Sequence, residues 1–236
     1  MTNSVPHLVA TQLEASYGES KALHGVTFQL ARGELVSLLG RNGAGKTTVL
    51  KSIMGLIANV AGSIKIDGVE CLRERPFRIA RRGVGYCPEE RAVFSSLSVR
   101  ENLDLPPAVR PGGLSTEEIF QMFPRLLERA SSQGTKLSGG EQQILAISRT
   151  LRSGADLLLL DEPTEGLAPV IVKQIGELIN SLKARGMTIL LVEQNFKFAC
   201  SVASRHLIVE RGQIVDEFHA ADVSQGGGQI AKYLGV

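Results

Sequence analysis

Short apolar runs alternate with longer helical patterns along most of the chain. The runs with the alternating or uniformly apolar character of β-strands lie at about 8–14, 26–30, 35–39, 63–66, 84–87, 156–160, 188–192, 206–210 and 213–218. Helical periodicity is clearest at about 45–57, 99–105, 116–129, 140–153, 170–184 and 195–203. The strands at 35–39 and 157–160 lack polar alternation, so we expect both of their faces to be covered, as in a parallel sheet. The pattern predicts an α/β fold.

Residues from about 88 to 152 break this alternation. The strand signal disappears and helical patterns take over, which predicts a helical segment inserted into the α/β core. A loop within this segment is predicted by Pro106, Pro107, Pro111, Gly112 and Gly113. Gly186 is a stop signal for the helix at 170–184, and Glu210-Arg211-Gly212 predicts a tight hairpin between two strands. Gly226-Gly227-Gly228 predicts a flexible link to a short terminal helix.

Composition narrows the class of protein. Of the 236 residues, 43% are hydrophobic and 21% are charged, as in a globular protein with a sizeable core. Lys and Arg number 26 against 24 Asp and Glu, so the net charge of +2 gives no support to a nucleic-acid partner. The cysteines lack metal-ligand spacing, so we expect Cys71, Cys87 and Cys200 to be buried and unpaired. No secretion signal or membrane-spanning run occurs, which predicts a cytosolic protein with at most a peripheral membrane role.

The clearest chemical motif follows the strand at 35–39 and opens the next helix. It fits the phosphate-loop pattern G-x-x-x-x-G-K-S/T in the required context between a strand and a helix. Its residues are Gly40, Arg41, Asn42, Gly43, Ala44, Gly45, Lys46 and Thr47, and Thr48 follows. The glycines let backbone N–H groups turn toward phosphates, Lys46 reaches the β- and γ-phosphates, and the Thr47 hydroxyl can ligate Mg²⁺. The motif predicts nucleotide binding.

A second motif predicts the acids of a hydrolytic site. The apolar strand at 157–160 ends in Asp161 and Glu162. In a phosphate-loop enzyme an acid at this point holds Mg²⁺ directly or through water, which we expect of Asp161. Glu162 is expected to orient and deprotonate the attacking water. An acidic pair after a strand is by itself more often a solvated cap, but together with a phosphate loop it predicts nucleotide hydrolysis.

A third motif, Leu137-Ser138-Gly139-Gly140-Glu141-Gln142-Gln143, lies between the other two. Ser138 is a good N-cap, and Gly139 and Gly140 let the amino terminus of a helix approach an anion closely. A second phosphate-binding device is redundant if both devices face one nucleotide in one subunit. The simpler arrangement places them at different nucleotides across a dimer.

These three motifs, in this order, resemble the nucleotide-binding subunit of an ATP-binding-cassette (ABC) transporter. The resemblance implies a single ABC ATPase domain over 8–236, with the helical subdomain at about 88–152. The implied fold is a phosphate-loop NTPase core with a mainly parallel sheet, an antiparallel β subdomain and the inserted helical subdomain. In this family two domains form a head-to-tail sandwich around two ATP molecules. Ser138 and Gly140 would therefore serve the ATP held by the partner's Lys46 and Thr47.

Four further positions match or depart from the family pattern. Tyr17 matches the aromatic residue that stacks on adenine. Glu89 stands where the family usually has a glutamine that senses Mg²⁺ and faces the membrane partner, and a carboxylate can still contact the metal. Gln194 occupies the place of the family's histidine; it cannot titrate, but its amide can donate to a γ-phosphate oxygen. The catalytic role therefore falls on Glu162, and Ala168 replaces an Asp that usually communicates across the dimer.

Short stretches at 40–43, 88–89, 165–169 and 193–195 narrow the resemblance to the ATPase subunits of branched-chain amino acid importers. That group implies ATP, Mg²⁺, a second ABC ATPase subunit that is a copy or a paralogue, and two integral membrane permease subunits. It also implies a periplasmic substrate-binding protein, no nucleic acid, and a position on the cytoplasmic face of the membrane. Urea and amide importers are close relatives, and residues 196–199 do not distinguish them. A soluble ABC ATPase of the cluster-assembly type is the alternative outside transport.

Overall fold

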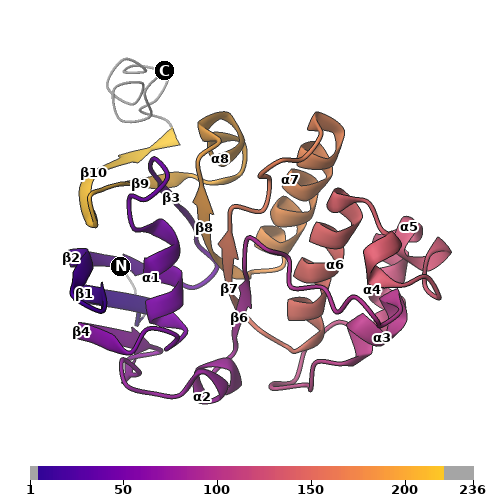
Figure 1. The fold of residues 1–236 in the computed structure, drawn as a ribbon, viewed down its shortest axis with the longest axis horizontal. Helices are drawn as coiled ribbons and strands as arrows, with labels where there is room; N and C mark the ends of the chain where they lie inside the picture. Colours follow the sequence, from indigo (N-terminus) through magenta and orange to yellow (C-terminus); the bar gives the residue numbers. More distant parts are fainter. Residues whose placement is uncertain (1–4, 221–236) are drawn as a thin grey trace.

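The computed structural model describes residues 5–220, so the glycine link and helix expected near 226–228 lie outside the described residues. The molecule contains a six-stranded and a four-stranded sheet, and the four-stranded sheet lies at one edge (Figure 1). The strands are β1 (Leu8–Tyr17), β2 (Ser20–Leu30), β3 (Leu35–Leu39), β4 (Asn59–Ile66), β5 (Val69–Glu70), β6 (Val84–Cys87), β7 (Leu157–Asp161), β8 (Thr188–Glu193), β9 (Arg205–Glu210) and β10 (Gln213–His219). The helices are α1 (Lys46–Ile53), α2 (Pro76–Arg81), α3 (Val99–Asp104), α4 (Thr116–Met122), α5 (Pro124–Glu128), α6 (Gly139–Arg152), α7 (Pro169–Ala184) and α8 (Phe196–Val202), with a 3₁₀ turn at Gly134–Lys136.

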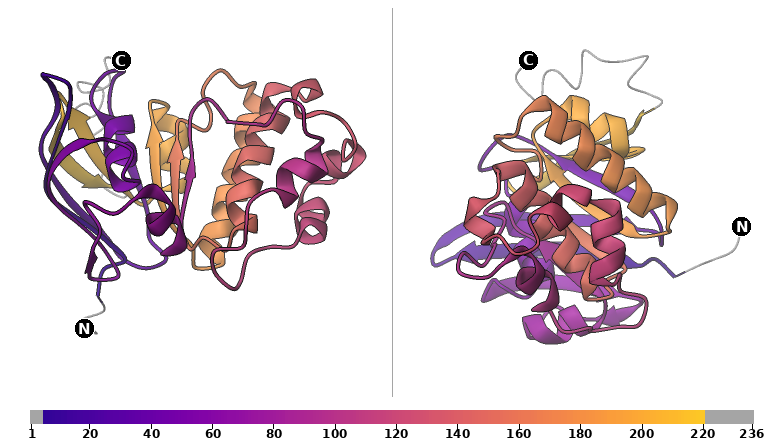
Figure 2. Two further views of the ribbon diagram at one scale, coloured as in Figure 1. Left: turned by 60° about the horizontal axis from the view of Figure 1, so that its bottom comes forward. Right: turned by 90° about the vertical axis from the view of Figure 1, so that its right-hand side faces the viewer.

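The larger sheet runs in the order β10-β9-β3-β8-β7-β6 and is parallel except for the predicted β9–β10 hairpin. In β7, Leu157 and Leu159 pack into the core shared with the smaller sheet and α1, whereas Leu158 and Leu160 pack beneath α6, α7 and α8. Successive side chains of a strand point to opposite faces, so a strand covered on both faces must be apolar throughout. The left view of Figure 2 shows these layers. The mainly parallel sheet predicted from the sequence is confirmed.

The smaller sheet is antiparallel, in the order β2-β1-β4-β5. Its first two strands are longer than predicted, because the hairpin that joins β1 to β2 is largely polar and exposed and shows little hydrophobic pattern. The pairing of β1 is irregular near Gln12, which has a φ of 47°. A Cβ on Gly62 would lie 2.3 Å from the Gln12 carbonyl oxygen, so the close approach of β4 at this bulge requires glycine.

The helical segment differs from the prediction at one point. The single helix expected at 116–129 is wrong, because α4 ends at Met122 and α5 begins at Pro124. Proline lacks an N–H group and disfavours the helical conformation in the residue before it, and Phe123 has a φ of −130°. The short helix α2 was not predicted, because six residues are too few to show a clear apolar period.

Helix α6 joins the helical segment to the α/β core. Ile144 and Leu145 pack with α3, α4 and α5, whereas Ile147 and Leu151 pack beneath the parallel sheet. Ser138 caps α6 as predicted, accepting a hydrogen bond from the backbone N–H of Glu141. The third motif is therefore held rigidly by both cores.

All three cysteines lie within the described residues. Cys71 and Cys87 are buried and free, as expected, but Cys200 is only half-buried, so its predicted burial is wrong. The Cys200 Sγ lies 3.8 Å from Nε2 of His206 at the exposed side of α8. Across residues 5–220, no helix combines the length and the apolar character needed to cross a membrane.

His206 is a buried titratable group on β9. Its Nδ1 lies 2.7 Å from the Ser37 Oγ, and its ring stacks on Phe218 with centroids 4.8 Å apart. Burial, and then the charge of His219, lower the pKa of His206 from its ordinary 6.5 to about 4. The unfolded chain therefore binds more protons than the folded one in this window. The stability that is fully present above pH 6.5 falls by about 3 kcal/mol as the pH drops toward 4.

We expect His206→Asn, which cannot titrate, to remove this part of the pH dependence. The measurement is the free energy of unfolding in urea for both proteins, above pH 6.5 and near pH 4. Wild-type protein should lose more stability between the two conditions than the variant does. Equal losses would contradict the account, whatever the absolute stability of the variant.

Candidate active site

The turn between β3 and α1 carries the predicted phosphate loop. Gly43 and Gly45 have φ values of 77° and 107°, which side-chain-bearing residues rarely adopt. A Cβ on Gly40 would lie 2.3 Å from the Val209 carbonyl oxygen, so this end of the loop packs directly on β9. Helix α1 begins without a side-chain cap, which leaves the N–H groups of its first turn free to bind an anion.

Lys46 lies inside the loop and is 4% exposed. Its Nζ donates to the carbonyl oxygens of Gly40, at 2.8 Å, and of Arg41, at 3.2 Å. It also lies 3.1 Å from the Oε1 of Glu162, which is itself buried. The structure therefore brings together the cation of the first motif and the acid of the second.

Asp161, at the end of β7, faces the start of α1. The Thr47 hydroxyl donates to its Oδ1 at 3.0 Å, and the Tyr86 hydroxyl donates to its Oδ2 at 3.1 Å. Burial raises the pKa of Asp161, while these two hydrogen bonds oppose the rise. A bound cation would favour the ionised carboxylate.

The donors around Asp161 fit Mg²⁺ bound together with a nucleotide. A carboxylate and the Thr47 hydroxyl are hard oxygen ligands, and Mg²⁺ commonly takes its remaining ligands from phosphate oxygens and water. Nowhere in residues 5–220 do three His, Cys, Asp or Glu side chains gather as a metal cage. One carboxylate beside one hydroxyl suits a metal that brings phosphate oxygens and water as its other ligands. Glu89, the third predicted ligand, lines a cavity together with Thr47.

Glu162 adopts a strained backbone conformation, with a φ of 43°. Its N–H donates to the Val192 carbonyl oxygen at 3.0 Å, which fixes the turn against β8. Its Oε2 accepts a hydrogen bond of 2.6 Å from the Gln194 amide, while Oε1 faces Lys46. Gln194 is therefore in the site, in contact with the candidate base.

A cavity of about 270 Å³ opens over these groups. Its lining consists of Ala22, Asn42, Gly43, Gly45, Lys46, Thr47, Thr48, Glu89, Glu162 and Glu165. Glu165 lies within hydrogen-bond reach of Glu89 and Glu162; partial burial, and then the charges of these two groups, raise its pKa. Tyr17 is 51% exposed at the end of β1, Arg41 is also exposed, and neither is part of the lining.

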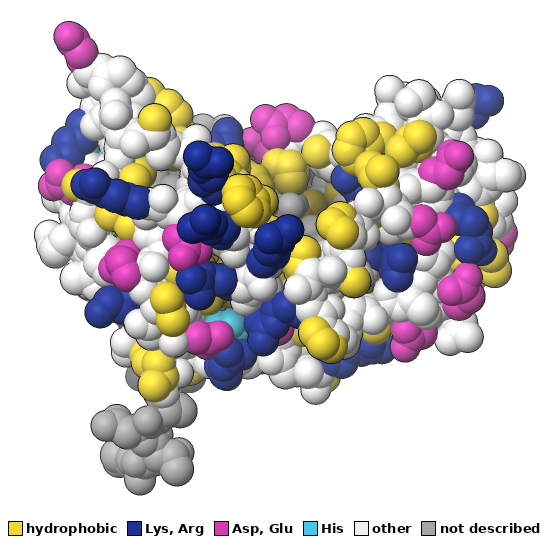
Figure 3. Space-filling model, turned by 90° about the horizontal axis from the view of Figure 1, so that it is seen from below, with side chains coloured by type: hydrophobic (Ala, Val, Ile, Leu, Met, Phe, Trp, Pro, Cys, Tyr) yellow, Lys and Arg dark blue, Asp and Glu magenta, His cyan; other side chains and the backbone are white. Residues whose placement is uncertain are grey.

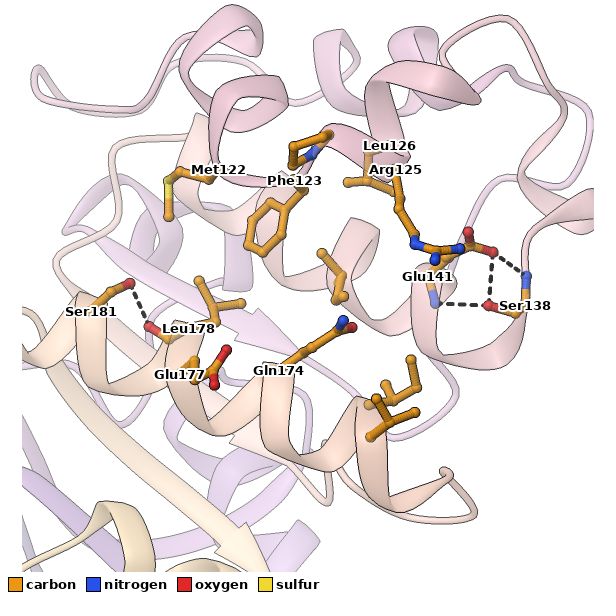
Figure 4. Close-up of a pocket in the computed structure, with 14 residues that line it drawn as sticks. Met122, Phe123, Arg125, Leu126, Ser138, Glu141, Gln174, Glu177, Leu178 and Ser181 are labelled. Carbon is orange, nitrogen blue, oxygen red and sulfur yellow. Dashed lines mark hydrogen bonds between the residues drawn. The ribbon is translucent and has the colours of Figure 1, made fainter.

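Residues of the third motif line a different pocket. Ser138 and Glu141 form a reciprocal capping box at the start of α6, with the Ser138 Oγ 2.7 Å from the Glu141 Oε2. They line a largely apolar pocket of about 590 Å³ between α5, α6 and α7 (Figure 4). This pocket and the phosphate-loop cavity share no lining residue. One chain therefore does not bring Ser138 to its own phosphate loop.

Gly140 is held against α7. A Cβ on it would lie 2.4 Å from the Ile171 Cγ2 and 2.8 Å from its Cγ1. We expect Gly140→Ala to lower the free energy of unfolding by roughly 1–3 kcal/mol through overpacking. Urea denaturation is the measurement. Adding Ile171→Ala should relieve the clash, so the double variant should lose less stability than the sum of the two single variants. A Gly140→Ala protein as stable as wild type would contradict this close packing, and so would additive losses.

Sequence reasoning did not find three residues of this site. Tyr86 reaches Asp161 from the neighbouring strand, Glu165 lines the cavity, and Glu193 accepts a 2.7 Å hydrogen bond from the Thr164 hydroxyl behind Glu162. Glu193 precedes Gln194 in the chain, and Glu165 lies three positions after Glu162. Adjacency of strands β6 and β7 is the only signal that could have indicated Tyr86, and the sequence does not display it.

The chain is similar in sequence to known ABC transporter proteins. The sequence pattern of the ABC transporter family matches residues 23–165. The chain is 43% identical, over 84% of its length and 87% of the relative's, to the high-affinity branched-chain amino acid transport ATP-binding protein BraG of Pseudomonas aeruginosa. It is 33% identical, over 97% of each chain, to the lipopolysaccharide export system ATP-binding protein LptB of Escherichia coli.

The chain is also similar to solved structures of ABC transporter proteins. An ATP-binding subunit of an ABC transporter is 32% identical, with a TM-score of 0.78 over 94% of this chain and 93% of that one. A dimeric bacterial ABC transporter cassette is 26% identical, with a TM-score of 0.80 over 90% of this chain and 98% of that one.

Proposed function

Because the chain belongs to the ABC transporter family and is an ATP-hydrolysing subunit of that family, we propose that it powers an importer of branched-chain amino acids. The observation that carries the proposal is the 43% identity to BraG over most of both chains. The resemblance ties Glu89 and the Glu193-Gln194-Asn195 stretch to this group. Glu89 lines the phosphate-loop cavity, and Gln194 contacts Glu162, which also lines it.

In the proposed reaction the chain's own residues bind ATP and activate water. Lys46 exchanges its loop carbonyl partners for the β- and γ-phosphates, and Thr47 with Asp161 holds Mg²⁺, which neutralises phosphate charge when bound. Glu162 orients a water and takes its proton. Gln194 positions the Glu162 carboxylate and offers its amide to the γ-phosphate. Tyr17 stacks on the adenine from the rim.

The complete site is proposed to form between two subunits. Ser138, Gly139 and Gly140 are absent from the lining of the loop cavity of their own chain, and Ser138 and Gly139 lie at the amino terminus of a capped helix that favours an anion. A second ABC ATPase subunit, either a copy or a paralogue, brings its phosphate loop to this run. ATP then holds the two chains together until it is hydrolysed.

The face toward the membrane partners is proposed to be a hollow of about 360 Å³ between α1, β6 and α6. Its lining includes Leu56, Tyr86 and Arg149, and the strand β6 leads from it directly to Glu89 at the ATP cavity. A segment of an integral membrane permease seated here would sense closure through that loop. The chain would work at the cytoplasmic face, beneath two permeases and a periplasmic binding protein.

The transported substrate is tested by isolating the chain with its membrane subunits from the native host. We expect ATPase activity in reconstituted vesicles to rise with leucine, isoleucine or valine and the matching binding protein. Lipopolysaccharide-dependent activity would instead favour the export role of LptB, whose identity of 33% spans 97% of both chains. Stimulation by urea or an amide, or the absence of any membrane subunit, would also overturn amino acid import.

A further inference from the structure

Helix α2 and the segment before it present an unpaired arginine surface. Arg73, Arg75, Arg78 and Arg81 are exposed, and none of them forms an ion pair with another residue in the described range 5–220. The one acid in this stretch, Glu74, is already paired with Arg82 at 2.6 Å. Although the whole chain carries a net charge of only +2, the positive charge here is locally uncompensated.

Two exposed apolar side chains accompany these arginines. Phe77 is 49% exposed, and the guanidinium carbons of Arg78 and Arg81 lie 6.0 and 5.5 Å from its ring centroid. Leu56 is 50% exposed and lines the same hollow as Ala80 of α2. We call Arg73, Arg75, Phe77, Arg78 and Arg81 the arginine surface, and Leu56 lies in the hollow beside it. Figure 3 shows Lys and Arg side chains gathered beside hydrophobic ones on this underside of the molecule.

We propose that the arginine surface binds the anionic headgroups of a lipid bilayer directly. A basic residue near an anionic membrane contributes about 1 kcal/mol, and aromatic and aliphatic side chains among such residues can enter the headgroup region. The exposed Phe77 favours a bilayer over a nucleic acid, whose backbone offers no apolar layer. The inference rests on the proposed function only for the orientation of the chain on the membrane, because the arginine surface borders the hollow proposed to receive the permease.

The test uses the full chain without permeases and two kinds of vesicle, one of phosphatidylcholine alone and one containing phosphatidylglycerol. We expect co-flotation only with the anionic vesicles, weakened by salt. Replacing Arg75, Arg78 and Arg81 by glutamine should lower the affinity roughly 100-fold. The matched control replaces Arg125, Arg129 and Arg185 by glutamine; these arginines are also exposed but lie in other parts of the chain, and the control should bind as wild type does.

Three results would overturn the proposal: equal binding to neutral vesicles, no loss in the α2 variant, or an equal loss in the control. Loss of permease binding without any vesicle binding would assign the arginine surface to the permease instead. Binding to duplex DNA but not to vesicles would assign it to nucleic acid. Vesicle binding needs no transported substrate, so failure of the proposed import function leaves this result unaffected.

Glu193, at the end of β8, is a buried acid that is only 2% exposed. Its Oε1 accepts hydrogen bonds from the Thr164 hydroxyl at 2.7 Å and the Thr164 N–H at 3.2 Å. Its Oε2 accepts from the Asn195 N–H at 3.3 Å. Thr164 belongs to the turn after Glu162, and Asn195 follows Gln194. One buried carboxylate thus joins the two segments that carry the Glu162–Gln194 pair.

We infer that Glu193 is a positioning residue for the proposed ATP hydrolysis. The strained backbone of Glu162 persists only if its surroundings hold it, and a small misplacement of a reacting group can lower a rate roughly 100-fold. Glu193 fixes the turn on one side, while the Val192 carbonyl oxygen fixes the Glu162 N–H on the other. The inference rests on the proposed role of Glu162.

Glu193→Gln removes the charge and one acceptor, and we expect kcat to fall at least about tenfold with little change in ATP affinity. Thr164→Val should act in the same direction, whereas Thr164→Ser keeps the hydroxyl and should retain the rate. If Glu193→Gln does not fold, the two Thr164 variants decide. A lower melting temperature with an unchanged kcat, or equal rates for the Val and Ser variants, would overturn the inference. An inactive wild-type protein would instead overturn the proposed function.

Discussion

Replacing Glu162 by glutamine is expected to slow ATP hydrolysis roughly 10²–10⁴-fold while ATP binding stays intact. The substitution keeps the size of the side chain and an oxygen for the Gln194 amide, which lies 2.6 Å away. It removes the carboxylate that can take a proton from water. Binding should persist because the phosphate loop and Lys46 are unchanged. Steady-state phosphate release and equilibrium binding of a fluorescent ATP analogue measure the two effects.

Glu165→Gln is the matched control for this experiment. It removes a carboxylate from the rim of the same cavity, but Glu165 has no contact with Lys46 in the ion pairs of the described residues. We expect less than about a tenfold change in rate, as for a group that takes no proton in the reaction. Near-normal phosphate release by Glu162→Gln, or equal losses in the two variants, would contradict the role given to Glu162.

Lys46→Met is expected to weaken ATP binding roughly 10–100-fold, because charge-assisted hydrogen bonds to the phosphates are lost. The variant also leaves the Glu162 carboxylate buried without its partner at 3.1 Å. We therefore expect a lower free energy of unfolding as well, partly restored in Lys46→Met/Glu162→Gln, which has no unpaired carboxylate. Equilibrium binding and urea denaturation separate these effects.

Lys51→Met serves as the control for Lys46→Met, since Lys51 lies in the last turn of the same helix and outside the cavity lining. It should bind ATP as wild type does. Unchanged ATP affinity in Lys46→Met would contradict the assignment of the loop. A stability loss that Glu162→Gln does not relieve would contradict the buried pair.

Local sequence signals predicted those parts of the molecule that depend on local chemistry. A strand, a glycine-rich turn and a helix fix Lys46 and Thr47, and the unbroken apolar run of β7 places Asp161 and Glu162 at the end of a buried strand. The cap at Ser138 is likewise a property of a few neighbouring residues. Pro124 carried enough information to end α4, and a stricter use of the proline rule would have found the break.

Contacts between distant segments were beyond sequence reasoning. The Tyr86–Asp161 bond depends on β6 lying beside β7, and the Gln194–Glu162 bond depends on β8 lying on the other side. Strand order follows from how helices pack on both faces of the sheet, which no single segment encodes. The buried carboxylate of Glu193 looks in the sequence like any acid at a strand end.

The central claim is that each ATP is hydrolysed between the phosphate loop of one chain and the Ser138 run of another. Two lesions test it directly in heterodimers selected with different affinity tags: Lys46→Met disables the loop, and Ser138→Arg disables the run. With one lesion on each chain, one complete site remains, so ATP hydrolysis should persist. With both lesions on one chain opposite a wild-type chain, neither site is complete, and hydrolysis should be lost. The reverse pattern, with activity only when both lesions share a chain, would show that each chain uses its own run and would contradict the account.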